Sequence, residues 1–330
     1  RNALENSTTA SDNTAVGNVA LFANTTGTEN TAVGGNAGDS ITTGNRNIAI
    51  GFEALTAATT GIQNTAVGRY ALRACTTPNH NTAIGARSLE VNTTGEYNTA
   101  LGTFAGYANT DGSNNVIAGY TALYNSVSQD RVVAIGYEAL YNSNVDMASF
   151  NVSVGYQAGR ASTTGYNNTF IGGEAGKGIT TGINNTFLGA GAGSGAAVDT
   201  DNNVILGSSS VSTLRCQTQT ISGLSDQRDK TAIEDLAVGL DFINTLIPRK
   251  FTWAMREASA NNGKTQTGFI AQELQTSVGS LDYLNLVDNY NDETLHSNMG
   301  NLIPIMVNAI KELSAKNIAL ETRVATLEAA

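Results

Sequence analysis

The first two thirds of the chain repeat one short sequence unit with a nearly constant period. The pentapeptide Asn13-Thr-Ala-Val-Gly17 returns, with small changes, every 17 residues. Twelve copies begin at residues 13, 30, 47, 64, 81, 98, 115, 132, 151, 168, 185 and 203, with steps of 19 residues from 132 to 151 and 18 from 185 to 203. A unit this short cannot bury an apolar face alone, so each coil must stack on the next and share one thin core.

Each copy is expected to hold two short strands and two turns. The alternation in Thr-Ala-Val predicts a strand of about four residues. The segment after the repeat glycine, such as Phe52-Glu-Ala-Leu55, is predicted to be a second strand, and Thr25-Thr-Gly27 a turn in which glycine can take a positive φ. The recurring Asn and Thr should align as side-chain ladders. A strand spacing of about 4.8 Å then predicts a rod on the order of 55–60 Å long.

Two copies carry a resemblance to a known family. Asn81-Thr-Ala-Ile-Gly85 and Asn47-Ile-Ala-Ile-Gly51 are similar to the Asn-x-x-Ala-Ile-Gly units in the head of trimeric autotransporter adhesins, and the similarity covers roughly residues 10 to 207. The resemblance implies a left-handed parallel β-roll, with three rolls packed around one axis. Trimerisation would also stabilise so slender a core.

Composition divides the chain near residue 208. Residues 1–207 contain 29 of the 35 glycines and 22 charged side chains, whereas residues 208–330 contain 6 glycines and 24 charged side chains. We therefore predict a shaft over 1–207, a linker or strand over 208–224, and a small α+β domain over 225–330. Its expected elements are strands at Cys216–Ser222, Phe251–Trp253 and Leu284–Val287, a helix over Ile233–Leu246 stopped by Pro248, a turn at Asn261–Gly263 and a short helix from Gly268 to Leu274.

The last thirty residues carry a heptad pattern, which predicts a coiled-coil helix over about 303–328. The a positions are Ile303, Ile310, Asn317 and Val324, and the d positions are Met306, Leu313, Leu320 and Leu327. Lys316 to Glu321 and Arg323 to Glu328 have the g-to-e′ spacing that allows pairing between chains. An amphipathic helix lying on a core is the alternative, but four consecutive a/d pairs favour a parallel coiled coil, and a trimer is its expected state.

The segment Ser225-Asp226-x-Arg228-x-Lys230 begins the second domain. A serine five residues before a lysine means little alone, since a turn or a helix cap would produce it equally well. Together with the apolar helix, Pro248, Phe251-Thr-Trp253 and Gly268–Leu274, however, it resembles the intramolecular chaperone auto-processing domain at the C-terminus of phage tail spikes and tail fibres, over about residues 222 to 330.

This resemblance implies self-cleavage between Leu224 and Ser225 by a Ser–Lys dyad. Ser225 Oγ would attack the Leu224 carbonyl, and the neutral amine of Lys230 would accept the hydroxyl proton. Burial must favour the neutral amine, because a lysine side chain in water is protonated at neutral pH. Arg228 would also favour it, whereas Asp226 and Asp229 would oppose it. His296 is a possible supporting residue, and a purely structural role for it stays open.

Several classes of function are disfavoured by composition. A net charge of -10 argues against a nucleic-acid partner, and no apolar stretch is long enough to insert into a membrane. Cys75 and Cys216 are expected to be free thiols, and with His80 and His296 they match no metal-site spacing, so no metal or other cofactor is expected. A polysaccharide-cleaving enzyme needs a pair of carboxylates in a cleft, which the single acidic residues of the repeat do not supply. The chain begins at Arg1 rather than Met, so we expect a fragment of a longer protein.

These observations predict a phage tail-fibre or tail-spike fragment, assembled in the host cytoplasm and located in the virion. The expected partners are two further copies of the chain, the rest of the tail fibre or baseplate, and a glycan or protein receptor on the host surface. The C-terminal domain would drive trimerisation and then cleave itself from the shaft. The alternative is a non-cleaving trimeric cell-surface adhesin or structural fibre, in which this domain is only a trimerisation cap.

Overall fold

The computed structural model describes residues 2–145, 149–194, 199–211, 225–254, 263–291 and 294–329. The chain forms two compact units, Arg1–Ser209 and Ser210–Ala330. The strand expected at Cys216–Ser222 and the residue Leu224 lie outside the described residues.

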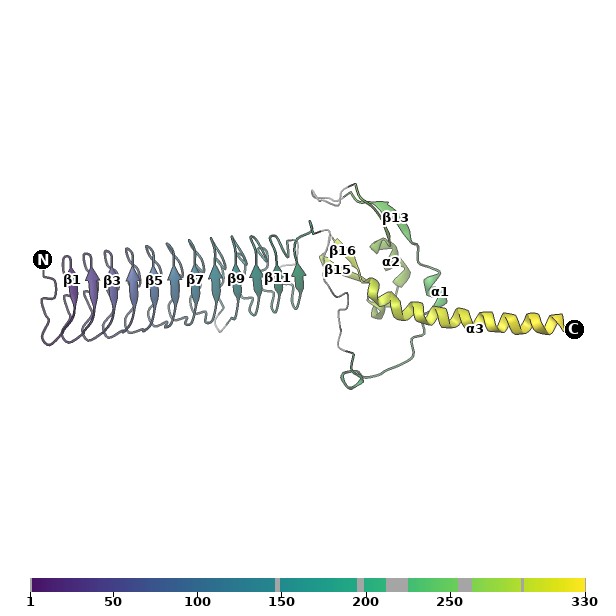
Figure 1. The fold of residues 1–330 in the computed structure, drawn as a ribbon, viewed down its shortest axis with the longest axis horizontal. Coiled ribbons are helices and arrows are strands. Elements are labelled where there is room, and N and C mark those ends of the chain that lie inside the picture. The colour runs from purple at the N-terminus through teal and green to yellow at the C-terminus, as the bar shows by residue number, and fades with distance from the viewer. Residues whose placement is uncertain are drawn as a thin grey trace. The chain divides into compact units, whose positions relative to one another are not determined.

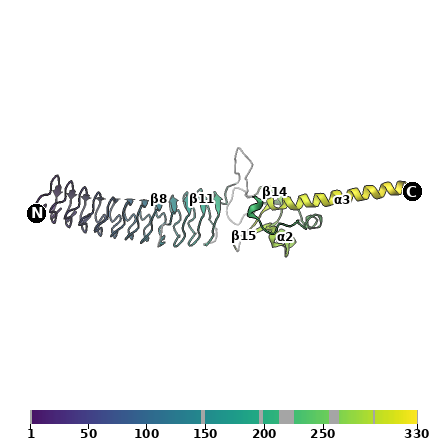
Figure 2. The same cartoon turned by 90° about the horizontal axis from the view of Figure 1, so that it is seen from below.

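The first unit is a parallel β-solenoid, seen as a row of equal rungs in Figure 1 and from a second side in Figure 2. Its strands stack in chain order, and each pairs in register with the next, so that Thr65 lies against Thr82 and Ala66 against Ala83. The twelve strands β1 to β12 span Thr14–Val16, Thr31–Val33, Ile48–Ile50, Thr65–Val67, Thr82–Ile84, Thr99–Leu101, Val116–Ala118, Val133–Ile135, Val152–Val154, Thr169–Ile171, Thr186–Leu188 and Val204–Leu206. The predicted repeat architecture is confirmed.

The core of the solenoid is a narrow column between the coil walls. The middle residue of each strand points inward, as Ala66 and Phe170 do, and a leucine from the segment after the repeat glycine, such as Leu55 or Leu72, packs beside it. Cys75 is buried in the same column as a free thiol, as predicted. The first and third residues of each strand point outward.

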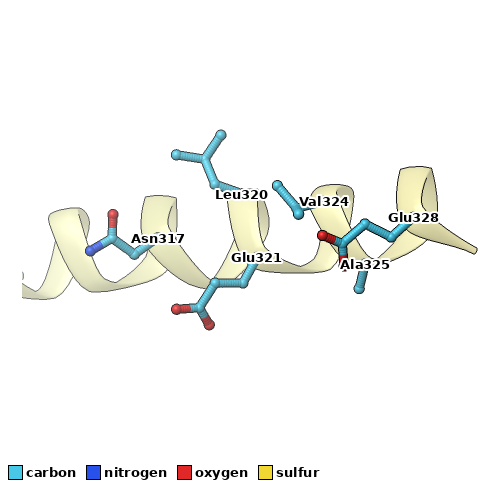
Figure 3. A pocket seen from close by; sticks show the side chains of 6 residues that line it. All are labelled: Asn317, Leu320, Glu321, Val324, Ala325 and Glu328. Atoms are coloured by element: carbon cyan, nitrogen blue, oxygen red, sulfur yellow. The ribbon is translucent and has the colours of Figure 1, made fainter.

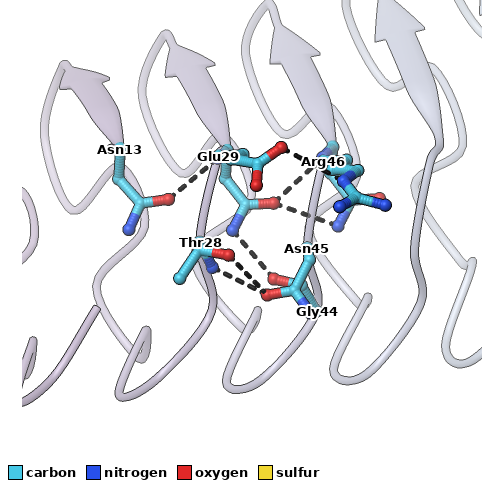
Figure 4. Close-up of polar contacts among 8 residues, drawn as sticks. Asn13, Thr28, Glu29, Gly44, Asn45 and Arg46 are labelled. Atoms are coloured by element: carbon cyan, nitrogen blue, oxygen red, sulfur yellow. Dashed lines mark hydrogen bonds and ion pairs between the residues drawn. The ribbon is translucent and has the colours of Figure 1, made fainter. Parts of the chain in front are cut away.

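Buried asparagines form the expected ladder along the shaft (Figure 4). The Oδ1 atom of a repeat asparagine accepts a hydrogen bond from the backbone N–H of the equivalent residue in the next coil, at 2.8 Å from Asn30 to Asn13 and 3.0 Å from Asn47 to Asn30. The Nδ2 atom of Asn30 donates to the Gly44 carbonyl at 2.8 Å. Threonines form a second ladder, in which Thr42 Oγ1 donates to the Thr59 carbonyl at 3.1 Å. These side chains satisfy buried backbone groups in coil after coil.

The prediction of a second strand in each coil is wrong, because the segment after the repeat glycine forms turns. In the coil that contains Phe52, the residues Glu53 and Leu55 adopt left-handed backbone angles, with φ of 53° and 52°, which an extended strand excludes. Inter-coil hydrogen bonds persist: Glu53 N–H donates back to the Gly35 carbonyl and Leu55 N–H donates forward to the Ala71 carbonyl, both at 3.0 Å. The bonds therefore alternate in direction without a β conformation.

The repeat glycine is required for stacking. Gly68 has φ of 138°, and a Cβ atom there would lie 2.5 Å from the carbonyl oxygen of Gly85 in the next coil. Any side chain at this position would push two coils apart.

The second unit packs short elements against one long helix. Its described elements are the 3-10 helices Gln227–Asp229, Asp282–Leu284 and Met299–Asn301, the helices α1 (Leu240–Ile243), α2 (Ala271–Val278) and α3 (Leu302–Glu328), and the strands β13 (Arg249–Thr252), β14 (Thr265–Gly268), β15 (Val287–Asn291) and β16 (Thr294–Ser297). Strands β13 and β14 form an antiparallel pair, as do β15 and β16. Phe242, Leu286, Leu302 and Ile305 are among the residues of its small core. The predicted small α+β domain and its C-terminal helix are confirmed.

The prediction of a helix over Ile233–Leu246 is too long, because within this range only α1 is helical. The preceding segment runs along α3, where Asn308 Nδ2 donates to the carbonyls of Leu236 and Val238 at 2.9 and 3.0 Å. Glu312 Oε2 accepts a hydrogen bond from the Leu240 N–H at 2.9 Å, at the first residue of α1. Contacts from distant α3 thus replace the hydrogen bonds that a longer helix would make.

Candidate functional site

A single turn of chain brings Ser225 and Lys230 together. The 3-10 helix Gln227–Asp229 begins after Asp226, whose side chain caps it by accepting a hydrogen bond from the Arg228 N–H at 2.9 Å. The Lys230 N–H donates to the Gln227 carbonyl at 3.1 Å, which closes the turn. Lys230 Nζ consequently lies 2.7 Å from Ser225 Oγ. This is hydrogen-bonding distance for a nucleophile and its base.

The neighbouring charges are paired with each other. The Arg228 guanidinium holds the Asp226 carboxylate, with Nη2 2.5 Å and Nε 3.0 Å from its two oxygens. This hydrogen bonding lowers the pKa of Asp226 below its ordinary value. Asp226 therefore forms its ion pair with Arg228 and not with Lys230, so its negative charge is partly neutralised beside the dyad.

The single chain leaves this site open to solvent. Ser225, Arg228 and Lys230 are all exposed. Nothing within the described part of one chain supplies the desolvation that favours a neutral lysine. The dyad geometry is therefore present in one chain, whereas the low-dielectric environment that the chemistry needs is not.

His296 lies on β16, where it is exposed and pairs in register with Asp288 of β15. Its supporting role at the dyad stays a prediction.

Helix α3 has two apolar faces. Leu302, Ile305 and Ala309 are buried in the second unit. The predicted heptad residues point elsewhere: Ile303 and Ile310 are each 63% exposed, and Leu327 is 69% exposed. Figure 3 shows Leu320 and Val324 along the last turns of this helix, beside Glu321 and Glu328. A helix that keeps an apolar stripe in solvent has a surface that another chain can cover.

Residues 225–282 match the family model of the chaperone of endosialidase. The chain carries a chaperone-of-endosialidase domain. The match begins at Ser225, the serine that lies next to Lys230. No curated protein and no solved structure matches the chain.

The chaperone-of-endosialidase family is a self-cleaving serine-peptidase type of domain. This domain behind a β-solenoid confirms the predicted arrangement of a fibre shaft followed by a C-terminal chaperone, and it fits a tail fibre or tail spike. Within the described residues, no group of three or more His, Cys, Asp or Glu side chains could hold a metal ion. None of the helices there is long and apolar enough to cross a membrane.

Proposed function

We propose that this chain is a homotrimeric phage tail-fibre or tail-spike piece whose C-terminal chaperone drives trimerisation and then cleaves the chain between Leu224 and Ser225. The shaft stays with the rest of the fibre in the virion and contacts the host surface. The observation that carries the proposal is the family match starting at Ser225, with Lys230 Nζ 2.7 Å from the serine hydroxyl.

The proposed cleavage balances as an acyl shift followed by hydrolysis. Ser225 Oγ attacks the Leu224 carbonyl carbon while Lys230 Nζ takes the hydroxyl proton. The peptide C–N bond then breaks, the Ser225 amine leaves with the proton, and an ester joins the Leu224 acyl group to Ser225 Oγ. Water hydrolyses this ester, which leaves a carboxylate on Leu224 and a free hydroxyl on Ser225.

Two separate apolar surfaces support a trimer. The first is the outer face of the shaft sheet, where the outward positions of all twelve strands hold only Thr, Val, Ile, Leu or Ala. Ile84 and Leu101 are 43% and 42% exposed there. A long uncharged sheet face of this kind is normally covered by another surface.

The second apolar surface is the exposed heptad stripe of α3. A parallel three-stranded coiled coil would bury it in an assembly in which three like helices run in the same direction. The two surfaces are consistent with the same assembly, in which like chains run parallel.

The test compares wild type with Ser225→Ala and Lys230→Ala on denaturing gels. Wild type should release the 106 residues from Ser225 to Ala330, about a third of the mass, and both variants should remain whole. Lys250→Ala, which removes another exposed lysine, is the matched control and should still cleave. Unboiled samples should run as trimers in every case. An uncleaved wild-type trimer, or a Ser225→Ala chain that cleaves, contradicts the dyad, and the first result favours the non-cleaving trimeric adhesin instead.

A further inference from the structure

Stacked tyrosines cover one face of the shaft between its sixth and ninth coils, counting from Asn13. They form two columns with one ring per coil. In one column the ring centroids are 5.1 and 5.3 Å apart, and in the other 5.8 and 5.3 Å. We call this surface the tyrosine face, and its columns are Tyr107, Tyr124 and Tyr141, and Tyr120, Tyr137 and Tyr156. The second column is exposed and the first is half-buried, and a cluster of aromatic rings at the surface marks a binding site.

The chemistry of this face differs from that of the sheet face. The six tyrosines come from the first and fifth positions after the repeat glycine, and the second position is also partly exposed except at Thr121, which is buried. Across these coils the three positions hold aromatic, hydroxyl, carboxyl, amide or guanidinium side chains and no aliphatic one. The sheet face, by contrast, offers only threonines and aliphatic side chains. Rings mixed with hydrogen-bonding groups suit a partner that is itself half apolar and half polar at every step.

The second tyrosine column ends at Tyr156, and the space beyond this ring, where the next coil carries no side chain, is called the step below. Tyr156 is 53% exposed, and Tyr137 is the only ring partner that the described part of the chain gives it. The same position in the next coil is Gly173, and no atom lies within 4 Å of where its Cβ would be. Gly173 therefore puts no side chain against the Tyr156 ring, and no ring in the described part of the chain stacks on its side toward that coil. The other column differs, since the Arg160 guanidinium lies over the last ring, 5.4 Å from the centroid of Tyr141.

Charged groups lie near this step in balanced pairs. Lys177 and Glu174, from the coil of Gly173, form an ion pair at 2.8 Å, and Arg160 pairs with Glu138. The step is thus an aromatic wall beside a bare backbone, with donors and acceptors at its rim and little net charge.

We propose that the tyrosine face binds a polysaccharide, with one sugar ring stacked on the open side of Tyr156. A pyranose has an apolar C–H face and a rim of hydroxyls, which match the ring and the polar groups around it. The rings within each column lie too close together, at 5.1 to 5.8 Å, to admit a sugar ring between them, so the end of the column at Tyr156 is where one can stack. The inference rests on the proposed contact of the shaft with the host surface and names the class of molecule contacted.

The test uses the full chain as the purified trimer on an array of bacterial O-antigen and capsular polysaccharides, with bacterial outer-membrane proteins spotted beside them. Wild type should bind a subset of the polysaccharides. Tyr156→Ala should weaken that binding on the order of tenfold, as loss of one aromatic stacking contact does. Tyr97→Ala is the matched control, because Tyr97 is also 53% exposed and also stacks on a ring, that of His80, on another face of the shaft.

Gly173→Ile supplies a variant that keeps every tyrosine. Gly173 is not in the left-handed region and has open space around it, so the shaft should fold while the isoleucine fills the step. Polysaccharide binding should fall as it does in Tyr156→Ala.

The outcomes separate this inference from the proposed function. Binding only to the protein spots overturns the polysaccharide while keeping the host-surface role. Polysaccharide binding that Gly173→Ile leaves unchanged overturns the site at Tyr156. A trimer that binds no spot of either kind overturns both the polysaccharide inference and the receptor-contacting shaft, whereas trimerisation and cleavage are scored separately on gels.

Discussion

The asparagine ladder allows a worked prediction of stability from one side chain. Asn64 is fully buried. Its Nδ2 atom donates to the Pro78 carbonyl at 2.8 Å, and its Oδ1 atom accepts from the Asn81 N–H at 3.1 Å. Asn64→Ala leaves these two buried backbone groups without that partner. Because each such loss costs about 1–3 kcal/mol, we expect the shaft to lose about 2–6 kcal/mol per chain.

The matched control is the same substitution at the end of the ladder. Asn13 makes the equivalent two hydrogen bonds, to the Gly27 carbonyl and from the Asn30 N–H, but it is only half-buried. Water can replace its bonds, so Asn13→Ala should cost clearly less than Asn64→Ala. Asn64→Asp keeps the volume but places an oxygen against the Pro78 carbonyl, so it should destabilise the shaft at least as much as alanine at neutral pH.

The measurement is unfolding by guanidinium chloride, followed by circular dichroism at one fixed trimer concentration. Equal midpoints for the Asn64→Ala and Asn13→Ala chains would refute the reasoning, because burial would then make no difference to the ladder. Loss of trimerisation by Asn64→Ala before unfolding would show that the side chain acts on assembly instead.

Three further predictions concern other parts of the chain. Gly239→Ala places a Cβ 2.0 Å from Glu312 Oε1, so it should displace the carboxylate from the Leu240 N–H and lower the free energy of unfolding by about 1.5–3 kcal/mol. A Gly239→Ala, Glu312→Ala double variant should then be little less stable than the Glu312→Ala chain. Additive losses of stability in thermal unfolding would contradict this. Leu320→Lys should dissociate the trimer in light scattering, while Ile318→Lys, which is equally exposed but off the heptad stripe, should not. Burial raises the pKa of Cys75 to about 12, so its thiol should resist alkylation at pH 8 until the shaft unfolds, and a labelled Cys75 peptide from folded protein would disprove it.

The repeat made most of the shaft predictable. A fixed period places equivalent residues in register, so the parallel pairing of Thr65 with Thr82 and the asparagine ladder both follow from the sequence pattern. The strand length and the left-handed turns do not follow. Leucine and glutamate do not favour positive φ, yet Glu53 and Leu55 adopt it because stacking supplies their N–H groups with carbonyl partners in both neighbouring coils.

A second feature that the repeat pattern does not predict is that a large core side chain can fill the space left by a small residue elsewhere in the shaft. Where the core leucine is replaced by glycine, as at Gly159 and Gly176, the ring of Phe170 occupies the space that a Cβ would enter, 2.7 and 2.3 Å away. Gly159 lies 11 positions before Phe170, on the preceding coil, and Gly176 lies 6 positions after it, on the same coil. Short motifs cannot express this exchange of volume, because each copy of the repeat looks like a weaker match on its own.

In the second unit, the helix length could not be predicted because it depends on contacts between residues far apart in the sequence. The hydrophobic spacing of Leu236, Leu240 and Ile243 is correct for a helix, yet Asn308 binds the carbonyl of Leu236 and Glu312 binds the N–H of Leu240, each 72 residues away. Those contacts hold the first part of the segment in a different conformation. The Ser225–Lys230 contact is local by comparison, since one capped turn is enough to form it.

Because Ser225 and Lys230 are exposed in the single chain, we expect the dyad to act only after assembly. In the single chain the Lys230 amine donates a hydrogen bond to the Ser225 hydroxyl oxygen, whereas the proposed reaction needs this amine to accept the hydroxyl proton. Asp226 is paired with Arg228 and not with Lys230, and Lys230 is exposed, so burial of the lysine is the change still needed before it can act as a base. Neighbouring chains can supply it, because α3 of the same unit carries an exposed heptad stripe that would draw three copies together. Cleavage should therefore follow trimerisation, and Leu320→Lys should block both, whereas Ser225→Ala should block cleavage alone.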